Sequence, residues 1–475
     1  MSIKWCEELI ALPSLSRTGN SLEQGREFPN LLELSIWSCP NLKELPSLFA
    51  SLQVLEICGC QELAELPKLP SIRELEFKKC SEGVLQSIVG LASLTYLHLH
   101  QIPPLTCLHE GFLQHLIALK ELQIAHVNEI ITLSNDIGLQ NLLHLERLEI
   151  SGCPLLKELS HCLFRLSSLK ELRVWRCPSL LSFPGTGLPS TLRGLEIKDC
   201  EALQFLPEWK VQNGNMLSFP LEYLVIEGCP SLKSLPKGEL PSTLKVLEIQ
   251  NCINLESLPK DMIHNNSSLE FLKISGCHSV TSFPRGLHNL IHLNQLEITE
   301  CPLLQSIAEF GLPTYKLQPI KISNCGSLKS LPNRMNSLTS LQELCIEGCF
   351  DLVSVPEGGL PANLLSLSIL DCENLKPSFD WGLHRLTCLT NLTFGGCQGL
   401  VSFPEDWLLP TSLSSLHLQR LPNLESLPKR LNNLTSLDNL ELSECDRLQT
   451  FSEEEQPKML QNFEILGCPL TSDFV

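Results

Sequence analysis

Apolar residues recur along the chain in a pattern that changes period halfway through each unit. The segment 31–39, LLELSIWSC, places Leu31, Leu34 and Ile36 before Cys39, and the same spacing precedes Cys229 and Cys445. The next residues, PNLKELP, carry two leucines three apart and a proline at each end. The repeating unit is L-x-x-L-x-I-x-x-C-P-x-L-x-x-L-P, and we number its first nine residues as positions one to nine.

This unit recurs in register along nearly the whole chain. Nineteen complete frames place their ninth position at residues 39, 60, 80, 102, 127, 153, 177, 200, 229, 252, 277, 301, 325, 349, 372, 397, 421, 445 and 468. Their mean period is about 24 residues, inside the 20–29 range of leucine-rich repeats. A partial repeat, residues 1–30, comes first, with Ile3 and Cys6 at positions six and nine. We therefore expect one solenoid domain over residues 1–475, with about nineteen complete repeats between residues 31 and 475.

The alternation at positions three to seven predicts a short strand with one buried face, because side chains of a strand point to alternate sides. Strands of successive repeats are expected to pair in parallel on the concave side. Proline lacks an N–H donor, so the segments after position nine should be extended or 3₁₀-like. The predicted fold is a β-dominated α/β-type solenoid, a leucine-rich-repeat horseshoe with a parallel sheet on its concave face and an irregular, helix-poor convex side.

Sixteen frames carry cysteine at position nine, whereas the other three carry Ile102, Val127 and Leu421. A metal ligand or nucleophile is not exchanged for an aliphatic residue, but a small buried apolar side chain can be. We therefore interpret these cysteines as a structural ladder whose S–H groups bond carbonyls of the following turn. The ladder comprises Cys39, Cys60, Cys80, Cys153, Cys177, Cys200, Cys229, Cys252, Cys277, Cys301, Cys325, Cys349, Cys372, Cys397, Cys445 and Cys468.

Composition narrows the class of protein further. The net charge is −18, which disfavours nucleic acid and anionic membranes as partners. No apolar run is long enough to span a bilayer, and the first residues do not resemble a secretory signal. The 22 cysteines are then expected to be reduced thiols in the cytoplasm or nucleus.

Motifs for catalysis, phosphate binding and metal binding are missing from the sequence. There is no P-loop, no G-x-S-x-G elbow and no H-E-x-x-H. His98 and His100 should share the open face, but a metal site would need further ligands nearby. We expect no enzymatic activity, no metal and no cofactor in this chain.

The open face of the sheet is the expected binding surface, formed by positions three, five, seven and eight. Glutamate fills eight of nineteen fifth positions. These glutamates either keep the exposed face of the sheet soluble or form an acidic track for a basic partner. Arg147, Arg173, Trp175 and Arg176 interrupt this stripe on two adjacent strands, and interface anchors are enriched in Trp, Tyr and Arg. This patch is the first candidate contact site, unless Glu149 and Glu171 merely neutralise it. The complete candidate set is Trp37, Tyr96, Arg147, Arg173, Trp175, Arg176, Tyr223 and Phe271.

The unit LxxLxIxxCPxLxxLP resembles the C-terminal repeats of plant intracellular nucleotide-binding leucine-rich-repeat (NLR) disease resistance proteins. The match runs from Ile3 to Cys468, and its specific part is the Cys-Pro-x-Leu-x-x-Leu-Pro turn. The resemblance implies an effector-sensing and autoinhibitory region that acts in innate immunity. Its partners would be a pathogen effector or guarded host protein and the nucleotide-binding domain of the same receptor.

The sequence itself carries no nucleotide-binding or signalling domain, so ADP or ATP would bind in a module absent from this chain. Three alternatives stay open: a substrate adaptor of a ubiquitin ligase, a stand-alone scaffold or decoy derived from a resistance protein, and a secreted repeat inhibitor or receptor. The identity of the partner and the oligomeric state are not encoded in any motif.

Overall fold

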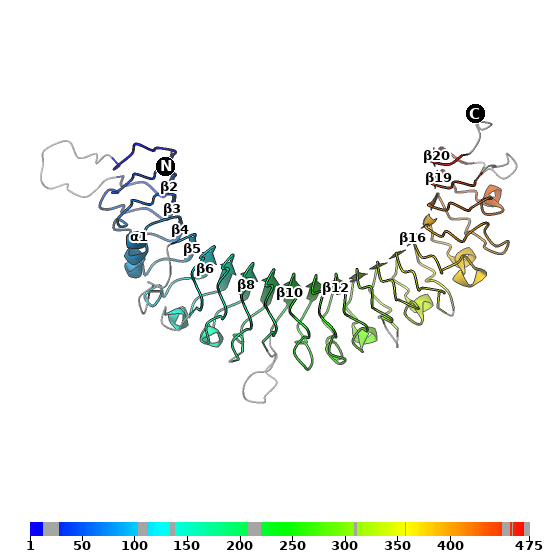
Figure 1. The fold of residues 1–475 in the computed structure, drawn as a ribbon, viewed down its shortest axis with the longest axis horizontal. Coiled ribbons are helices and arrows are strands. Elements are labelled where there is room, and N and C mark those ends of the chain that lie inside the picture. The colour runs from blue at the N-terminus through cyan, green and yellow to red at the C-terminus, as the bar shows by residue number, and fades with distance from the viewer. Residues whose placement is uncertain are drawn as a thin grey trace, which may run out of the picture. The chain divides into compact units, whose positions relative to one another are not determined.

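The computed structural model describes residues 1–12, 28–102, 112–133, 138–185, 187–207, 220–307, 311–356, 358–448, 457 and 459–469. The chain divides into two compact units, Met1–Leu232 and Lys233–Val475. Within each unit, strands and outer loops follow one another from left to right in Figure 1, in the order of the sequence. Whether the units form one domain stays a prediction.

The described residues of unit 1 form ten parallel strands. They are β1 (Ser2–Lys4), β2 (Glu33–Trp37), β3 (Val54–Cys58), β4 (Glu74–Lys78), β5 (Tyr96–His100), β6 (Glu121–Ala125), β7 (Arg147–Ser151), β8 (Glu171–Trp175), β9 (Gly194–Lys198) and β10 (Tyr223–Glu227). Each pairs in parallel with the next strand along the chain, in register position for position.

In unit 2 the part of the chain that the structure describes forms ten further strands with the same pairing rule. They are β11 (Val246–Gln250), β12 (Phe271–Ser275), β13 (Gln295–Thr299), β14 (Pro319–Ser323), β15 (Glu343–Glu347), β16 (Ser366–Leu370), β17 (Asn391–Gly395), β18 (Ser415–Gln419), β19 (Asn439–Ser443) and β20 (Asn462–Leu466). Consecutive strands are again parallel and in register.

Strands β2 to β20 each occupy positions three to seven of one frame, as the alternation predicts. In β3 the side chains of Leu55 and Ile57 are buried, whereas Val54, Glu56 and Cys58 are only half-buried. The buried residues of successive repeats stack into a continuous row, because equal positions lie opposite each other in the register. The predicted parallel β-solenoid is confirmed.

The outer side is helix-poor, also as predicted. Its only α-helix among the described residues is the single turn α1 (Glu82–Gln86), and the remaining helices are short 3₁₀ turns. These are η1 (Ser87–Gly90), η4 (Leu139–Asn141), η5 (Leu163–Arg165), η6 (Leu287–Asn289), η7 (Met335–Ser337), η8 (Phe379–Trp381), η9 (Leu383–Arg385) and η10 (Leu431–Asn433). Isolated bridges such as Ser234–Ser257 and Ser402–Ser426 lie two residues before a proline, which ends the pairing there.

Position eight has a conformation that the sequence analysis does not predict. In every described frame, and in the partial repeat, this residue has a left-handed φ between 49° at Gln101 and 69° at Gly59. The turn keeps one more hydrogen bond in the ladder: Arg176 N donates to Lys198 O at 2.8 Å, and Asn251 N donates to Ser275 O at 2.8 Å. The chain then bends at position nine and leaves the sheet.

Candidate protein-binding face

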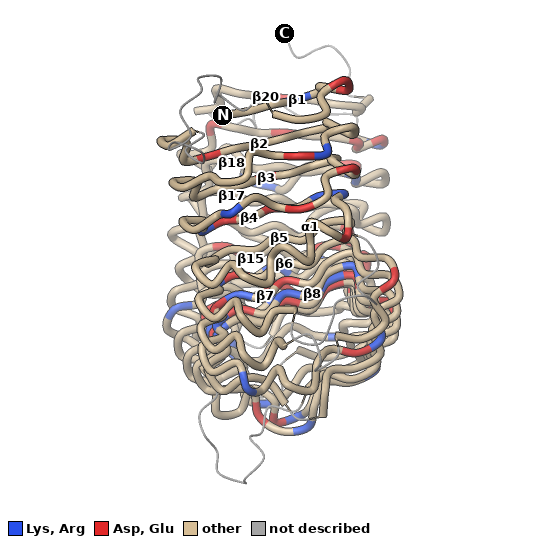
Figure 2. The backbone as a smooth tube through the Cα atoms, turned by 90° about the vertical axis from the view of Figure 1, so that its left-hand side faces the viewer, with Lys and Arg blue, Asp and Glu red and all other residues tan. Residues whose placement is uncertain are grey.

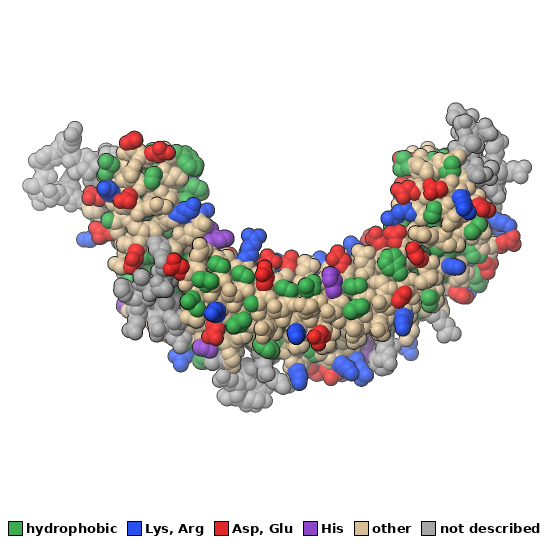
Figure 3. Space-filling view, viewed as in Figure 1, with side chains coloured by type: hydrophobic (Ala, Val, Ile, Leu, Met, Phe, Trp, Pro, Cys, Tyr) green, Lys and Arg blue, Asp and Glu red, His purple; other side chains and the backbone are tan. Residues whose placement is uncertain are grey.

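The open face of each unit is built from columns of equal positions. In unit 1 the fifth-position column joins Glu149 of β7, Arg173 of β8 and Glu196 of β9 as direct neighbours. Positive and negative segments therefore lie side by side at β7 and β8 (Figure 2). Over the visible surface, cations and carboxylates are interspersed (Figure 3).

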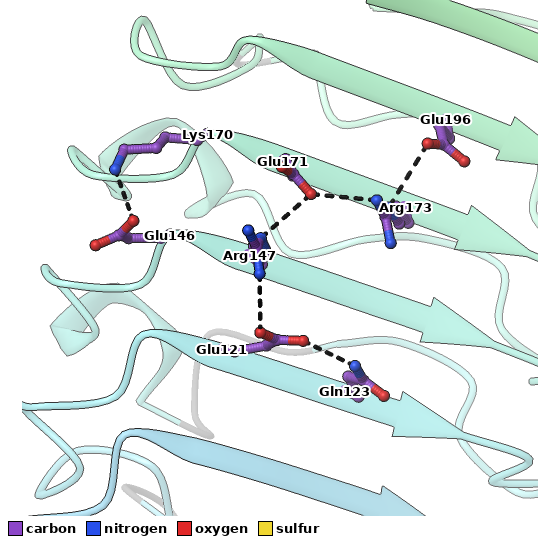
Figure 4. Close-up of polar contacts among 8 residues, drawn as sticks. All are labelled: Glu121, Gln123, Glu146, Arg147, Lys170, Glu171, Arg173 and Glu196. Atoms are coloured by element: carbon purple, nitrogen blue, oxygen red, sulfur yellow. Dashed lines mark hydrogen bonds and ion pairs between the residues drawn. The ribbon is translucent and has the colours of Figure 1, made fainter.

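Arg147 and Arg173 are joined by a shared carboxylate. Arg147 Nε and Arg173 Nη2 lie 3.4 Å and 3.3 Å from Glu171 Oε2, as Figure 4 shows. Arg147 Nη1 also lies 3.4 Å from Glu121, and Arg173 Nε lies 3.6 Å from Glu196. These partly exposed pairs each contribute about 0.2–1 kcal/mol, so their main effect is to hold the two guanidinium groups in place on the face.

Glu149 does not join this chain of ion pairs. Its Cα is the register partner of Arg173, yet no ion pair connects the two within the described region, and Arg173 instead turns to Glu171 and Glu196. Burial raises the pKa of Glu149, against a lowering contribution from Arg173. Of the two neutralising partners suggested by the sequence, the structure uses Glu171 only.

Trp175 lies between two cations. Arg173 Cζ and Lys198 Nζ are each 5.8 Å from the centre of its ring, at cation–π distance. Lys198 also pairs with Glu227 of β10 at 3.7 Å. The indole Nε1 of Trp175 is shielded from solvent and has no hydrogen-bond acceptor. An aromatic ring with an unused donor beside two cations is a typical interface anchor.

Arg176 occupies a different place from Arg147 and Arg173. It follows the end of β8 in the left-handed conformation, with its side chain 73% exposed. Its Nε lies 3.8 Å from Asp199 of the next repeat. Arg176 is therefore part of the edge where the strands end, beyond the chain of ion pairs.

Trp37 and Tyr96 lie on β2 and β5, apart from this patch. Lys4 Nζ is 5.1 Å from the centre of the Trp37 ring, and Trp37 Nε1 is shielded without an acceptor. Burial, and then the charges of Glu76 and Glu121, raise the pKa of Tyr96 to about 12. The Tyr96 hydroxyl therefore stays protonated at neutral pH.

Tyr223 and Phe271 belong to different units. A Cβ added at Gly194 would lie 1.7 Å from Tyr223 Cζ, which shows that the tyrosine ring covers this glycine on the neighbouring strand. Phe271 begins β12 in unit 2, opposite Val246 and Gln295. The structure thus brings Arg147, Arg173 and Trp175 together, whereas Trp37 and Tyr96 lie on other strands of unit 1 and Phe271 belongs to unit 2.

The ladder cysteines line the inside of the solenoid. Fifteen are buried, whereas Cys468 at the end of unit 2 is half-buried. Their thiols mostly donate to the carbonyl two residues earlier, as in Cys153 to Ser151 O at 3.5 Å, and several also reach the preceding repeat, as in Cys80 to Ile57 O at 3.5 Å. The expected acceptor was wrong for most of them: these bonds go to strand carbonyls, and Cys397 alone among the described bonds donates to a turn, at Glu373 O of the preceding repeat. Burial raises the pKa of Cys80 and of Cys277 to about 12.

Three histidines adjoin each other on β5 and just after β6. The ring centres of His98 and His100 are 5.9 Å apart, and those of His100 and His126 are 4.8 Å apart. Burial, and then Lys78, lower the pKa of His100 to about 4. In the described part of the chain, no group of three His, Cys, Asp or Glu side chains has the geometry of a metal site.

Unit 2 carries a polar row that the sequence analysis missed. Ser415 Oγ lies 2.8 Å from His417 Nε2, and His417 Nδ1 lies 3.1 Å from Glu441. The order resembles that of a hydrolase, but acyl transfer also needs preorganised donors for an oxyanion. The β18 backbone pairs with β17 and β19, and the Asn439 amide donates to Ser415 Oγ at 3.1 Å. The row is therefore a hydrogen-bonded part of the face. The periodic Ser, His and Glu at positions three and five are the only signal that could have found it.

No protein-family model matches this sequence, and no curated protein matches it. Among solved structures, the chain is similar to a leucine-rich-repeat protein of Leptospira interrogans, with 23% identity, 86% of this chain and 89% of that chain covered, and a TM-score of 0.48. It is also similar to the leucine-rich repeat domain of the type III effector XopL, with 24% identity, 52% and 75% coverage, and a TM-score of 0.35. At these scores neither likeness bears on what the chain binds.

None of the helices in the described ranges has the length and apolar composition that a bilayer span requires.

Proposed function

We propose that the chain is the protein-recognition region of a plant intracellular immune receptor, acting in the cytoplasm or nucleus. In this proposal it senses a pathogen effector or a guarded host protein and restrains a nucleotide-binding switch carried elsewhere. ATP or ADP would bind that switch, and this chain would carry no cofactor and perform no catalysis. The resemblance of the repeat to plant NLR proteins supplies the biological setting.

The observation that carries the proposal is the face of β7 and β8. Glu171 lies within ion-pair distance of both Arg147 and Arg173, and Trp175 adds an aromatic ring with an unused N–H. Interface anchors of this kind cost about 2 kcal/mol or more when truncated, because they sit in preorganised surroundings that exclude water. A repeat solenoid presents such a face without any change in its own fold.

The direct test is capture of a nucleotide-binding module from a matching receptor by the purified chain. We expect binding, and we expect Arg173→Glu combined with Trp175→Ala to weaken it by about thirtyfold, as roughly 2 kcal/mol requires. The matched control is Lys321→Glu, which reverses the charge of an exposed side chain at the fifth position of β14 in unit 2. Circular dichroism should show that both variants keep the strand content of the wild type.

Two results would overturn the proposal. One is that no such module binds and that the double variant leaves immune output in plant cells unchanged. The other is that Lys321→Glu weakens binding as much as the double variant does, because the effect would then follow from net charge and not from this face.

A further inference from the structure

One edge of the open face in unit 1 has a charge opposite to that of the chain. This edge, which we call the rim, consists of positions seven and eight of β1 to β9: the last residue of each strand and the left-handed residue after it. It carries five cations and one carboxylate, a net charge of +4, although the chain as a whole has −18. The charged residues of the rim are Lys4, Lys78, Lys79, Arg176, Lys198 and Asp199.

Neither the neighbouring columns of this face nor the equivalent positions of unit 2 have a net positive charge. Positions three and five of β2 to β9, on the same face, carry eight carboxylates and two cations. Positions seven and eight of β11 to β20, in unit 2, carry four carboxylates and one cation. The rim is thus distinct from the acidic columns beside it and from the equivalent positions of the other unit.

Three of the rim cations lack an anionic partner. Within the described residues, no carboxylate lies within ion-pair distance of Lys4, Lys78 or Lys79. Lys78 and Lys79 are consecutive, at positions seven and eight of β4, so two like charges adjoin and neither is in an ion pair among the described residues. An anionic ligand would relieve this repulsion.

Unpartnered polar atoms recur along the rim at a regular interval. Trp37 Nε1 of β2, His100 Nδ1 of β5 and Trp175 Nε1 of β8 are all shielded from solvent without a hydrogen-bond partner, and all belong to position seven. Three strand spacings separate each pair, about 14 Å. An extended chain covers that distance in about four residues. All three side chains are half-buried; the two indole nitrogens can only donate, and His100 Nδ1 donates when it carries the imidazole proton.

A recess lies beside the middle of the rim. Its volume is 580 Å³, and Lys79, Gln101 and His126 line it together with one carboxylate, Glu129. This recess is large enough for a side chain that points away from an extended backbone. At the first strand, Trp5 adds an aromatic ring that is 74% exposed.

We propose that the rim of unit 1 binds an extended acidic segment of a partner protein, about nine residues long, that crosses β2 to β8. Its carboxylates meet the unpaired lysines, and its carbonyl or carboxylate oxygens accept from Trp37, His100 and Trp175. The proposal rests on the proposed function only in that the partner is a protein. Apart from Trp175, the residues of this proposed site are separate from the ion pairs that link Arg147 and Arg173.

The test is fluorescence anisotropy with a labelled nine-residue peptide of alternating glutamate and serine, and with its lysine–serine counterpart. The full chain should bind the acidic peptide and not the basic one, with an affinity that falls as salt is added. Lys78→Glu with Lys79→Glu should weaken binding by about tenfold, or roughly 1.4 kcal/mol. Lys78→Gln with Lys79→Gln provides a milder variant if the charge reversal disturbs folding. Lys321→Glu in unit 2 is the matched control and should change binding less than about twofold.

Equal binding of both peptides, or loss of binding in Lys321→Glu alone, would overturn the proposal. So would an oligonucleotide of equal charge that binds as tightly as the acidic peptide, because the rim would then select polyanions and not peptides. Capture of the nucleotide-binding module serves as the second readout. If the peptide fails to bind while that module is captured, the rim proposal fails alone; if the peptide binds and the module does not, the proposed function fails alone.

Discussion

At the residue scale, burial and not sulfur chemistry determines which residue types position nine accepts. The ladder tolerates Val127 and Leu421, both fully buried, in the place that cysteine takes elsewhere. The thiol adds a weak donor for strand carbonyls, which an aliphatic side chain does not have. Because burial disfavours the thiolate, the ladder ties the stability of the solenoid to the protonation of its cysteines.

We predict that the free energy of unfolding falls in alkaline solution. An exposed thiol ionises near pH 8.5, whereas burial raises the pKa of Cys80 and Cys277 to about 12. Between these values the unfolded chain binds fewer protons than the folded chain, so the stabilisation present below pH 8.5 is lost as the pH rises toward 12. Urea unfolding at a series of pH values measures this slope. Cys277→Ala should flatten it, and an unchanged slope would contradict the explanation.

At the scale of the element, each strand ends in a left-handed residue. The penalty for this conformation is small for glycine and about 1 kcal/mol for other residues. Glycine occupies position eight at Gly152, Gly276 and Gly348, whereas Glu300 and Arg420 adopt the same φ at a cost. The structure tolerates that cost because the turn adds a ladder hydrogen bond and releases the chain toward the outer side.

Two opposite substitutions test this account of the strand end. Glu300→Gly should stabilise unit 2 by up to about 1 kcal/mol, because it removes the left-handed penalty. Gly152→Ala should destabilise unit 1 by about 1–3 kcal/mol, since its Cβ would also meet the His126 ring at 2.5 Å. Thr299→Gly, at an extended position, is the control and should destabilise. Urea denaturation compares the three, and a destabilising Glu300→Gly would refute the account.

At the scale of the molecule, each unit is a stack in which the described strands make their main contacts with their neighbours along the sequence. Stability in such a solenoid is close to a sum of repeat and nearest-neighbour contributions. The charge pattern of the face also extends over several repeats: in unit 1 the rim is positive, and the columns beside it are acidic. No single repeat contains either feature of this surface.

We predict that damage to one repeat stays local within its unit. Leu272 of β12 is 1% exposed, so Leu272→Ala should cost about 2–5 kcal/mol. Hydrogen exchange should accelerate in β11, β12 and β13 and remain unchanged in β19. Acceleration that reaches β19 to the same degree would show that unit 2 unfolds as one cooperative body.

The sequence alone determined the strands, the buried rows and the helix-poor outer side. The information that specifies these features is local: apolar residues at positions four and six set the buried face, and proline ends the strand pairing. It also located Arg147, Arg173 and Trp175 on adjacent strands, because a fixed period converts sequence distance into strand number.

Only the tertiary structure decided which contacts the side chains of the open face make. Which carboxylates Arg173 selects depends on side-chain reach along its own strand and across to the next, and the structure gives Glu171 and Glu196 in place of Glu149. The left-handed turn depends on the ladder of the next repeat, since Glu300 adopts the same φ region as Gly152 despite the cost for a non-glycine residue. The unused donors of Trp37 and Trp175 appear only when shielding and hydrogen bonding are known together. Such properties belong to contacts between repeats, which no single repeat encodes.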